Sequence, residues 1–274
     1  MKKEKTKLAH DGYVAIEFEP WAKDKLSHLE KYCNTFNTAT HRLPNKRIYI
    51  DLFSGPGKCI IKGTNEEIDG SPLLSLNCKI PFTHYFFNDI DSEYVEALKN
   101  RTKNYKYNIE YFNRDCNAFV DELLPKIPKN AICFAYIDPF YLSINFNTIE
   151  KLTKDRRVDL LIIFHIGQAK RNFFQPNSDM KLFFPPSVDW EIFPNEIITG
   201  GRINTRRVLD AYERGLIELG YPSQNIKDDV LERTRTNIPL YYLVFASKHS
   251  LGKKLYSGVI NRKDSLQRKF PFTT

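Results

Sequence analysis

Short runs of β-branched and aromatic residues alternate with segments of helical periodicity between residues 47 and 164. Apolar strands of this kind are buried on both faces, and strands that alternate with helices along the chain form a mostly parallel sheet. We therefore predict an α/β, Rossmann-like fold with helices on both faces of the sheet. The predicted strands are residues 47–53, 84–89, 108–112, 131–137 and 158–164, and a late strand at 240–246 is expected to join them.

Apolar positions at helical spacing predict helices over residues 21–38, 92–101, 118–124 and 205–219, whereas residues 8–20 are predicted to be extended or irregular. Residues 173–200 are rich in Phe, Pro and Asn and are predicted to form an irregular insertion. We divide the chain into three parts: a Rossmann-like domain with an N-terminal helix (1–172), a basic helical insertion (173–239), and a returning strand with a basic tail (240–274).

The chain carries 41 Lys or Arg and 33 Asp or Glu, which gives a net charge of +8. Its basic residues cluster at 154–157, 202–207 and 248–269. Such clusters attract polyanions, because contacts with phosphate groups release counterions. We expect nucleic acid as a partner, held mainly by the C-terminal third; the alternative is a solvated surface that is basic without a partner.

No apolar run reaches the roughly 20 residues that a membrane span needs, and no apolar stretch follows the lysines near residue 1. A cytoplasmic location is therefore expected. The five cysteines, at positions 33, 59, 78, 116 and 133, are scattered and have no pair of histidines nearby. Because a zinc site needs four converging ligands, we predict neither a metal site nor a disulfide.

Four of the predicted strands end at an aspartate or are closely followed by one, namely Asp51, Asp89, Asp115 and Asp138. The carboxyl ends of parallel strands meet at one edge of a sheet, and ligands of open α/β folds bind at that edge. We therefore expect the four aspartates to surround one binding site.

The segment Asp51-Leu-Phe-Ser-Gly-Pro-Gly57 directly follows the first of these strands. Its glycines permit a close approach between backbone and ligand, but it lacks the Lys-Ser/Thr of a phosphate-binding loop and the third glycine of a dinucleotide fingerprint. The order of polar groups favours S-adenosylmethionine. The predicted cofactor-binding residues are Asp51, Phe53, Ser54, Gly55 and Gly57 at the methionyl end, Asp89 and Asp91 at the ribose, and Asp115 and Cys116 at the adenine.

Helix capping is the alternative role for three of these acids, because each precedes a predicted helix. For Asp89 we favour contact with the ribose. Asp91, directly before Ser92, is better explained as an N-cap, and for Asp115 both roles stay open.

The tetrapeptide Asp138-Pro139-Phe140-Tyr141 follows the fourth strand and resembles the Asp-Pro-Pro-Tyr motif of amino-group methyltransferases. The resemblance implies that the Asp138 carboxylate and the Pro139 carbonyl accept hydrogen bonds from an exocyclic amine while an aromatic ring stacks on the base. Phe140 stands where that motif has proline, so the alternative is an aspartate that only ends a strand. The predicted catalytic residues are Asp138, Pro139 and Phe140, and the predicted substrate-binding residues are Tyr141, Lys170, Arg171 and Asn172, with His165 as a further candidate.

Several motifs occur in the order found in one known family. They are Trp21 with Lys25 and the segments 49–58, 70–73, 89–91, 115–117, 137–140, 158–161, 170–172 and 242–249. On these motifs the chain resembles the three-Cys-motif partner proteins. The resemblance implies a methyltransferase-like fold, a winged-helix-like C-terminal portion and a partner protein of the radical S-adenosylmethionine type.

A second likeness, through Gly70-Ser-Pro72 and the Asp138 motif, is to a bacterial ribosomal RNA adenine-N6 methyltransferase and implies adenine in nucleic acid as the substrate. We therefore expect an S-adenosylmethionine-dependent N-methyltransferase that acts on an exocyclic amine, with adenine N6 favoured. The alternative is a non-catalytic adaptor that binds nucleic acid and the radical-type partner. A nicotinamide dehydrogenase fits poorly, because Asp89, the candidate ribose acid, lies 32 residues past Gly57.

Overall fold

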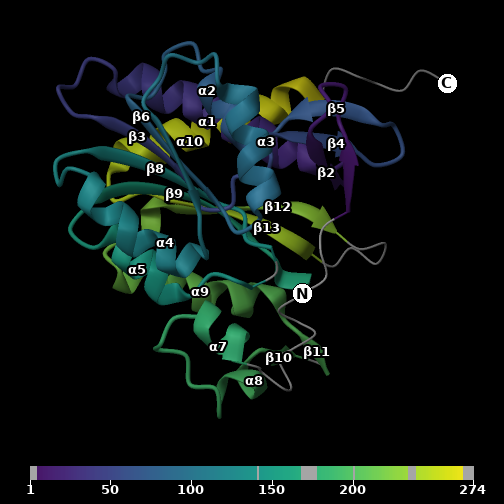
Figure 1. Ribbon diagram of the computed structural model, residues 1–274. Helices are drawn as coiled ribbons and strands as arrows, with labels where there is room; N and C mark the ends of the chain where they lie inside the picture. The colour runs from purple at the N-terminus through teal and green to yellow at the C-terminus, as the bar shows by residue number, and fades with distance from the viewer. Residues whose placement is uncertain (1–4, 141, 168–177, 200, 234–238, 268–274) are drawn as a thin grey trace.

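The computed structural model describes residues 5–140, 142–167, 178–199, 201–233 and 239–267. Figure 1 shows a large twisted sheet between two layers of helices, with a smaller sheet beside it. In the described residues the large sheet has seven strands. Their order across the sheet is β12 (Ile226–Arg233), β13 (Pro239–Ala246), β9 (Arg157–Phe164), β8 (Ile132–Ile137), β3 (Arg47–Asp51), β6 (His84–Asp89) and β7 (Ile109–Asn113).

Strand β13 runs antiparallel to both of its neighbours, β9 and β12, and the other neighbouring pairs are parallel. The predicted late strand therefore joins the sheet as expected, but in the opposite direction to the first five strands. The edge strand β12 was not predicted. The predicted α/β fold with a large, mostly parallel sheet is confirmed.

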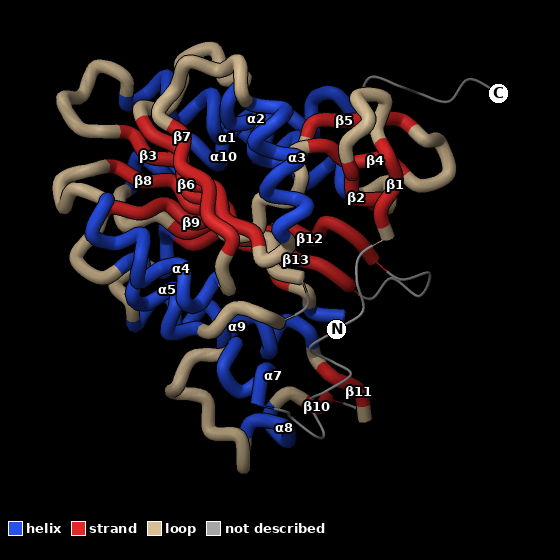
Figure 2. Tube along the Cα trace, in the orientation of Figure 1, coloured by secondary structure: helices blue, strands red, loops and turns tan. Residues whose placement is uncertain are grey.

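Side chains of the central strands alternate between two apolar layers. Ile48 and Ile50 of β3 pack with the helices α4 (Cys116–Leu123), α5 (Phe146–Thr153) and α9 (Thr205–Glu218). Tyr49 points to the other face, where α1 (Ala22–Thr40), α2 (Ser71–Leu76), α3 (Ser92–Thr102) and α10 (Ser250–Gln267) pack. Figure 2 shows these two groups of helices on opposite faces of the red strands. This burial on both faces explains why the strands are apolar throughout.

The predicted helices α1, α3, α4 and α9 agree with the structure within two residues at each end. Two short 3-10 helices, η1 (Leu124–Lys126) and η2 (Ser223–Asn225), follow α4 and α9. All five cysteines are buried free thiols. Among the described helices, none combines the length and the apolar character needed to cross a bilayer.

A second sheet that the sequence did not predict lies next to α3. It has the order β1 (Thr6–Leu8), β2 (Val14–Phe18), β4 (Lys58–Ile61) and β5 (Glu66–Asp69), with β2 parallel to β4. Arg101 of α3 ties it to the main domain, because its guanidinium donates to both carboxylate oxygens of Asp11 and to the carbonyls of Tyr13, Val14 and Pro56. The second sheet is thereby held against the loop that contains Pro56.

Between β9 and α9, the described residues include the short helices α7 (Ser178–Phe183) and α8 (Phe193–Glu196) and a hairpin of β10 (Ile198–Thr199) and β11 (Arg202–Ile203). These elements form the lower part of the molecule in Figure 1. The winged-helix-like portion and the three-part division stay predictions. Strand β12 of the predicted second part pairs with β13 of the predicted third part.

Candidate functional site

A cavity of about 350 Å³ lies at the carboxyl edge of the large sheet. Strand β3 pairs with β6 on one side and β8 on the other. The chain continues from β3 to β6 and β7 on the first side and then crosses to β8 on the second, so the strand order reverses at β3. This is the switch point at which ligands of open α/β folds bind. The cavity brings together nine of the predicted site residues: Phe53, Gly55, Asp89, Asp91, Asp115, Cys116, Asp138, Pro139 and Phe140.

Ser54 and Gly57 line a smaller adjoining pocket, which shares Gly55 and Asp138 with the cavity. Asp51 lines neither of the two, because it is completely buried beneath the loop. It accepts hydrogen bonds from the Phe53 amide and the Tyr49 hydroxyl, both at 3.2 Å. Burial raises the pKa of Asp51 to about 7. The structure therefore places Asp51 as a support of the loop rather than a surface of the cavity.

The loop between β3 and β4 depends on two glycines in the left-handed region, Gly55 (φ +59°) and Gly57 (φ +89°). A Cβ atom at position 57 would lie 2.9 Å from Leu98 Cδ1, so a side chain there meets both backbone strain and a steric contact. The Gly55 amide donates to Asp89 Oδ2 at 2.8 Å, and Arg101 donates to the Pro56 carbonyl. The loop is thus fixed before any ligand binds.

The three acids with capping alternatives are now distinguished. Asp91 caps α3 through the Glu93 amide, as expected, and Asp115 caps α4 through the Asn117 amide, although both also line the cavity. Asp89 caps neither helix. Its carboxylate accepts from the amides of Gly55 and Asp91, and burial raises its pKa above the ordinary value. Asp89 therefore joins the glycine loop to the end of β6.

Asp138, at the end of β8, forms an ion pair with Lys25 of α1, whose ammonium lies 2.5 Å from Asp138 Oδ2. Lys25 is buried and lies 4.2 Å from the centre of the Phe18 ring. Burial acts to raise the pKa of Asp138, but Lys25 and His165 outweigh it and hold that pKa at about 2. Asp138 is therefore ionised at neutral pH.

Aromatic rings surround this ion pair. Trp21 stacks on Tyr241 with ring centres 4.2 Å apart, and His165 meets the edge of Tyr241. His165 Nε2 lies 3.8 Å from Asp138 Oδ1, which is an ion-pair distance rather than a hydrogen bond. Both ring nitrogens of His165 are buried and have no hydrogen-bond partner among the described residues. The side of the cavity around Asp138, which we call the Asp138 side, is therefore rich in aromatic rings and carries the Lys25–Asp138 ion pair.

Several lining residues were not predicted from the sequence, including Ile16 and Phe18 of β2, Tyr94, Arg114 and Tyr241. Tyr241 reaches the cavity because β13 is antiparallel, so that its beginning lies at the carboxyl edge of the other strands. Lys25 could have been noticed, since it shares the apolar face of α1 with Ala22 and Leu29. The predicted substrate residues Tyr141, Lys170, Arg171 and Asn172 lie outside the described residues. Within the described part, no group of three or more His, Cys, Asp or Glu could hold a metal ion.

Neither a scan against protein-family models nor a search of curated proteins finds a match to this chain. Among solved structures, the chain is similar to a Legionella pneumophila protein described with the family model DUF519, with 12% identity, a TM-score of 0.53, and coverage of 86% of this chain and 90% of that chain. A likeness at this identity shows the fold alone.

Weaker likenesses are to an O-methyltransferase from Bacillus cereus in complex with SAH (8% identity, TM-score 0.46, 83% of this chain and 81% of that chain) and to an rRNA methylase from Streptococcus thermophilus (11% identity, TM-score 0.41, 83% and 93%).

Replacement of Lys25 tests the buried ion pair. Because Lys25 helps hold the pKa of Asp138 at about 2, below its ordinary 3.8, the pair stabilises the fold above pH 3.8 and loses this effect as the pH falls toward 2. At neutral pH, Lys25→Met leaves a buried carboxylate unpaired, and we expect urea unfolding to show a loss of about 3–5 kcal/mol. Lys23→Met, which removes an exposed pair with Glu66, is the matched control and should cost less than about 1 kcal/mol. Equal losses for the two variants would contradict the stabilising role of Lys25.

Proposed function

We propose that this protein binds S-adenosylmethionine and transfers its methyl group to an exocyclic amine, with adenine N6 in nucleic acid as the favoured target. One observation carries the proposal. A single cavity at the switch point joins the Gly55 loop, Asp89 and Asp115 to the Asp138-Pro139-Phe140 segment. The Gly55 loop, Asp89 and Asp115 suit the cofactor, and the segment 138–140 suits an amine.

The residues present fit the cofactor in three respects. Ser54 Oγ is buried at the smaller pocket without a hydrogen-bond partner among the described residues, so it is free to bind the methionyl head. Asp89 uses oxygen lone pairs on two backbone amides, and a carboxylate has about four such sites, which leaves room for ribose hydroxyls. Ile90 lines the cavity with 58% of its surface exposed, and this apolar side chain would cover the adenine ring.

When bound, S-adenosylmethionine supplies an electrophilic methyl group on a sulfonium centre. The protein's own task is then to orient the acceptor amine. Asp138 stays ionised and can only accept hydrogen bonds. Lys25 and the Tyr136 hydroxyl donate to its Oδ2. Its Oδ1, which has the His165 ring at 3.8 Å but no hydrogen bond from it, is left to accept an N–H of the amine. An amine held in this way is aligned for in-line attack, and alignment accounts for much of the rate enhancement in such reactions.

The substrate assignment is supported by three features. The Asp138 motif accepts an exocyclic N–H, the rings of Phe18, Trp21 and Phe140 line the cavity beside it, and the net charge of +8 favours a polyanion. Planar bases that are flipped out of a stack bind between aromatic or apolar side chains. A base that carries an exocyclic amine satisfies all three features.

Calorimetric titration with S-adenosylmethionine tests the cofactor assignment. We expect wild-type protein to bind, and Asp89→Asn to bind at least tenfold more weakly, a change of about 1.4 kcal/mol, since the variant loses charge-assisted hydrogen bonds to the ligand. Asp91→Asn is the matched control: it removes the same charge two residues away, and asparagine is an equally good N-cap. No binding by folded wild-type protein would overturn the proposed function.

The Lys25–Asp138 ion pair favours a second candidate function. Lys25 occupies one carboxylate oxygen of Asp138, and Phe140 stands in place of the motif's proline. The Asp138 side of the cavity could therefore hold a base without catalysing methyl transfer. The protein would then be an adaptor that binds S-adenosylmethionine and nucleic acid and serves a partner of the radical S-adenosylmethionine type.

Asp138→Asn separates the two candidates. For an enzyme, we expect the transfer of labelled methyl groups to RNA or DNA to fall by about 100-fold or more, because a group that holds the transition state is lost. The affinity for S-adenosylmethionine should change little. Asp121→Asn, an exposed change on α4, should leave transfer unaffected. If wild-type protein binds the cofactor but transfers no label to any nucleic acid, the adaptor is favoured.

A further inference from the structure

Five loops lead into the amino ends of β3, β6, β7, β8 and β9, at the edge of the sheet opposite the cavity. We call residues 41–46, 77–83, 103–108, 124–131 and 154–157 the amino-edge loops. They contain ten Lys or Arg and one acid, Asp155. The rest of the chain has 31 Lys or Arg and 32 Asp or Glu, so it is close to neutral. The positive charge of the protein is therefore concentrated in these loops.

Hydrogen bonds show that the amino-edge loops form one continuous surface. Asn108 donates to the Thr83 carbonyl, and Lys46 Nζ lies 3.3 Å from His84 Nε2 at the start of β6. On the other side, Asn45 donates to the Asn130 carbonyl, and Arg156 donates to the carbonyls of Leu124 and Ile127. Each loop is thus bonded to the next across the sheet or, for residues 41–46, to the start of the neighbouring strand β6.

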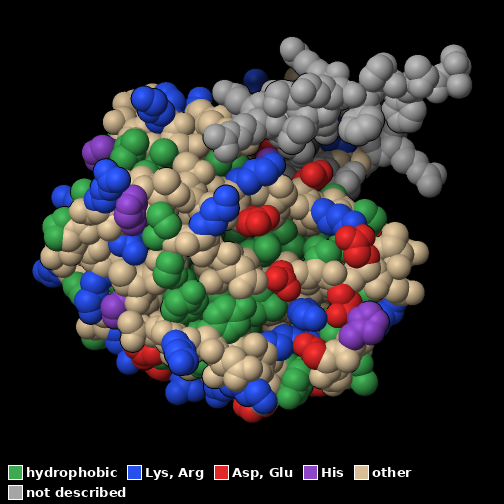
Figure 3. All heavy atoms as spheres, turned by 90° about the horizontal axis from the view of Figure 1, so that it is seen from above, with side chains coloured by type: hydrophobic (Ala, Val, Ile, Leu, Met, Phe, Trp, Pro, Cys, Tyr) green, Lys and Arg blue, Asp and Glu red, His purple; other side chains and the backbone are tan. Residues whose placement is uncertain are grey.

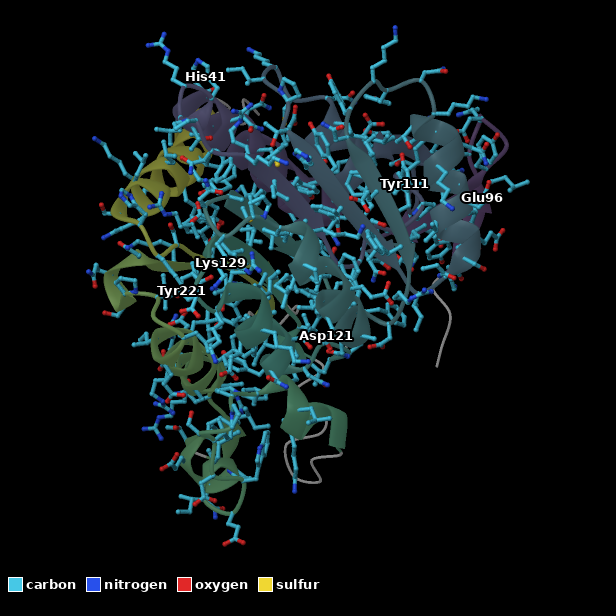
Figure 4. The ribbon with its side chains drawn as sticks, turned by 60° about the vertical axis from the view of Figure 1, so that its left-hand side comes forward. His41, Glu96, Tyr111, Asp121, Lys129 and Tyr221 are labelled. Atoms are coloured by element: carbon cyan, nitrogen blue, oxygen red, sulfur yellow. The ribbon has the colours of Figure 1, made fainter. Side chains whose placement is uncertain are left out.

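The cations on this surface are mostly exposed and uncompensated. Among the described residues, Lys126 pairs with Glu110, and no ion pair is formed by Arg42, Lys46, Lys79, Lys103, Lys106, Lys129, Lys154, Arg156 or Arg157. Burial lowers the pKa of His84, and the neighbouring Lys46 ammonium adds to this effect. Lys and Arg side chains dominate the left-hand margin in Figure 3, whereas acidic and basic side chains are mixed on the right. Figure 4 brings this side forward and shows His41 and Lys129 on it.

Stabilisation of helix C-termini does not explain this surface. Cations act on a helix dipole only within its last turn. Lys103 and Lys154 are the C-caps of α3 and α5, and Lys126 ends η1, whereas the other seven cations lie beyond the ends of the helices. The basic segment 202–207 differs, because its Arg206 is bound by the carboxylates of Asp210, Glu213 and Asp228. Around α9 the most heavily paired cation is thus neutralised, whereas at the amino edge only Lys126 has an ion pair among the described residues.

We propose that the amino-edge loops are a second nucleic-acid-binding surface, which holds the phosphate backbone of RNA or DNA at a distance from the cavity. Five adjacent strands span about 19 Å, since neighbouring strands lie roughly 4.8 Å apart, and the surface follows this width. A duplex strand presents a phosphate about every 3.4 Å, so several phosphates meet the surface at once. Tyr107, with 39% of its surface exposed, lies among the lysines and offers its ring to unpaired bases, which favours nucleic acid over an anionic membrane.

The surface goes beyond the proposed function, since it shares no residue with the cavity. Strands β6 and β8 have six residues each, so the surface and the cavity are about 20 Å apart. A folded nucleic acid can span this distance. It would be anchored at one edge of the sheet while its target base enters the other.

A matched pair of charge variants tests the surface. The first changes Lys46, Lys79, Lys106 and Lys129, one exposed lysine from each of four amino-edge loops, to Gln. The control changes Lys62, Lys99, Lys151 and Lys181, on other elements, to Gln and so has the same net charge. Binding of a fluorescent RNA duplex, a DNA duplex and a single strand is measured by anisotropy over a range of salt concentrations, with thermal unfolding as a check of folding.

We expect the amino-edge variant to bind at least one nucleic acid tenfold or more weakly than wild type, and the slope of log K against log salt to fall by about 3–4. The control should stay within about twofold of wild type. The nucleic acid whose affinity falls in the amino-edge variant shows whether the surface binds RNA or DNA. Equal losses in the two variants, or no binding of wild type to any of the three nucleic acids, would overturn the proposal. Both variants should bind S-adenosylmethionine with the same affinity as wild type. If wild type and both variants fail to bind it, the proposed cofactor site is wrong, but the nucleic-acid measurements still test the amino-edge loops.

Discussion

Strand β3 pairs in register with β6 on one side and β8 on the other, and the position of every site residue depends on this double pairing. Because all three strands are parallel, their carboxyl ends lie at the same edge of the sheet, and the loops that follow them are neighbours there. The cavity forms where the chain changes direction across the sheet. Residues far apart in sequence, such as Gly55, Asp89 and Asp138, are therefore neighbours for a topological reason.

Around this point the protein concentrates groups whose burial is costly. Two carboxylates, Asp51 and Asp89, have raised pKa values because they are buried, whereas Lys25 keeps Asp138 ionised. Clusters of shifted groups in and directly beneath a cavity are typical of functional sites. The two edges of the sheet thus differ in charge: acids line the cavity at the carboxyl edge, and uncompensated cations cover the amino-edge loops. A cationic cofactor suits the first edge and a polyanion suits the second.

Much of the large sheet could be predicted from the sequence, because long apolar strands and amphipathic helices have strong periodic signals. The predicted strand at 84–89 matches β6 exactly in extent, and α3 differs by one residue at its end. The second sheet was missed, since its strands have three to five residues and bury little apolar surface on their own. The ion pair of Lys25 with Asp138 was missed for another reason: its members are 113 residues apart. The aspartates that follow the strands predicted where the cavity lies. The sequence could not show that Asp51 is buried beneath the loop, whereas Asp89, Asp115 and Asp138 line the cavity.

The central claim is that the cavity at the β3–β8 switch point binds S-adenosylmethionine. Titration of ¹⁵N-labelled protein with S-adenosylhomocysteine, followed by NMR, tests it residue by residue. The account predicts the largest amide shifts at Gly55, Asp89, Ile90 and Cys116, with those of the amino-edge loops unchanged. Saturable shifts that avoid these four amides, or no shifts in a folded sample, would contradict it.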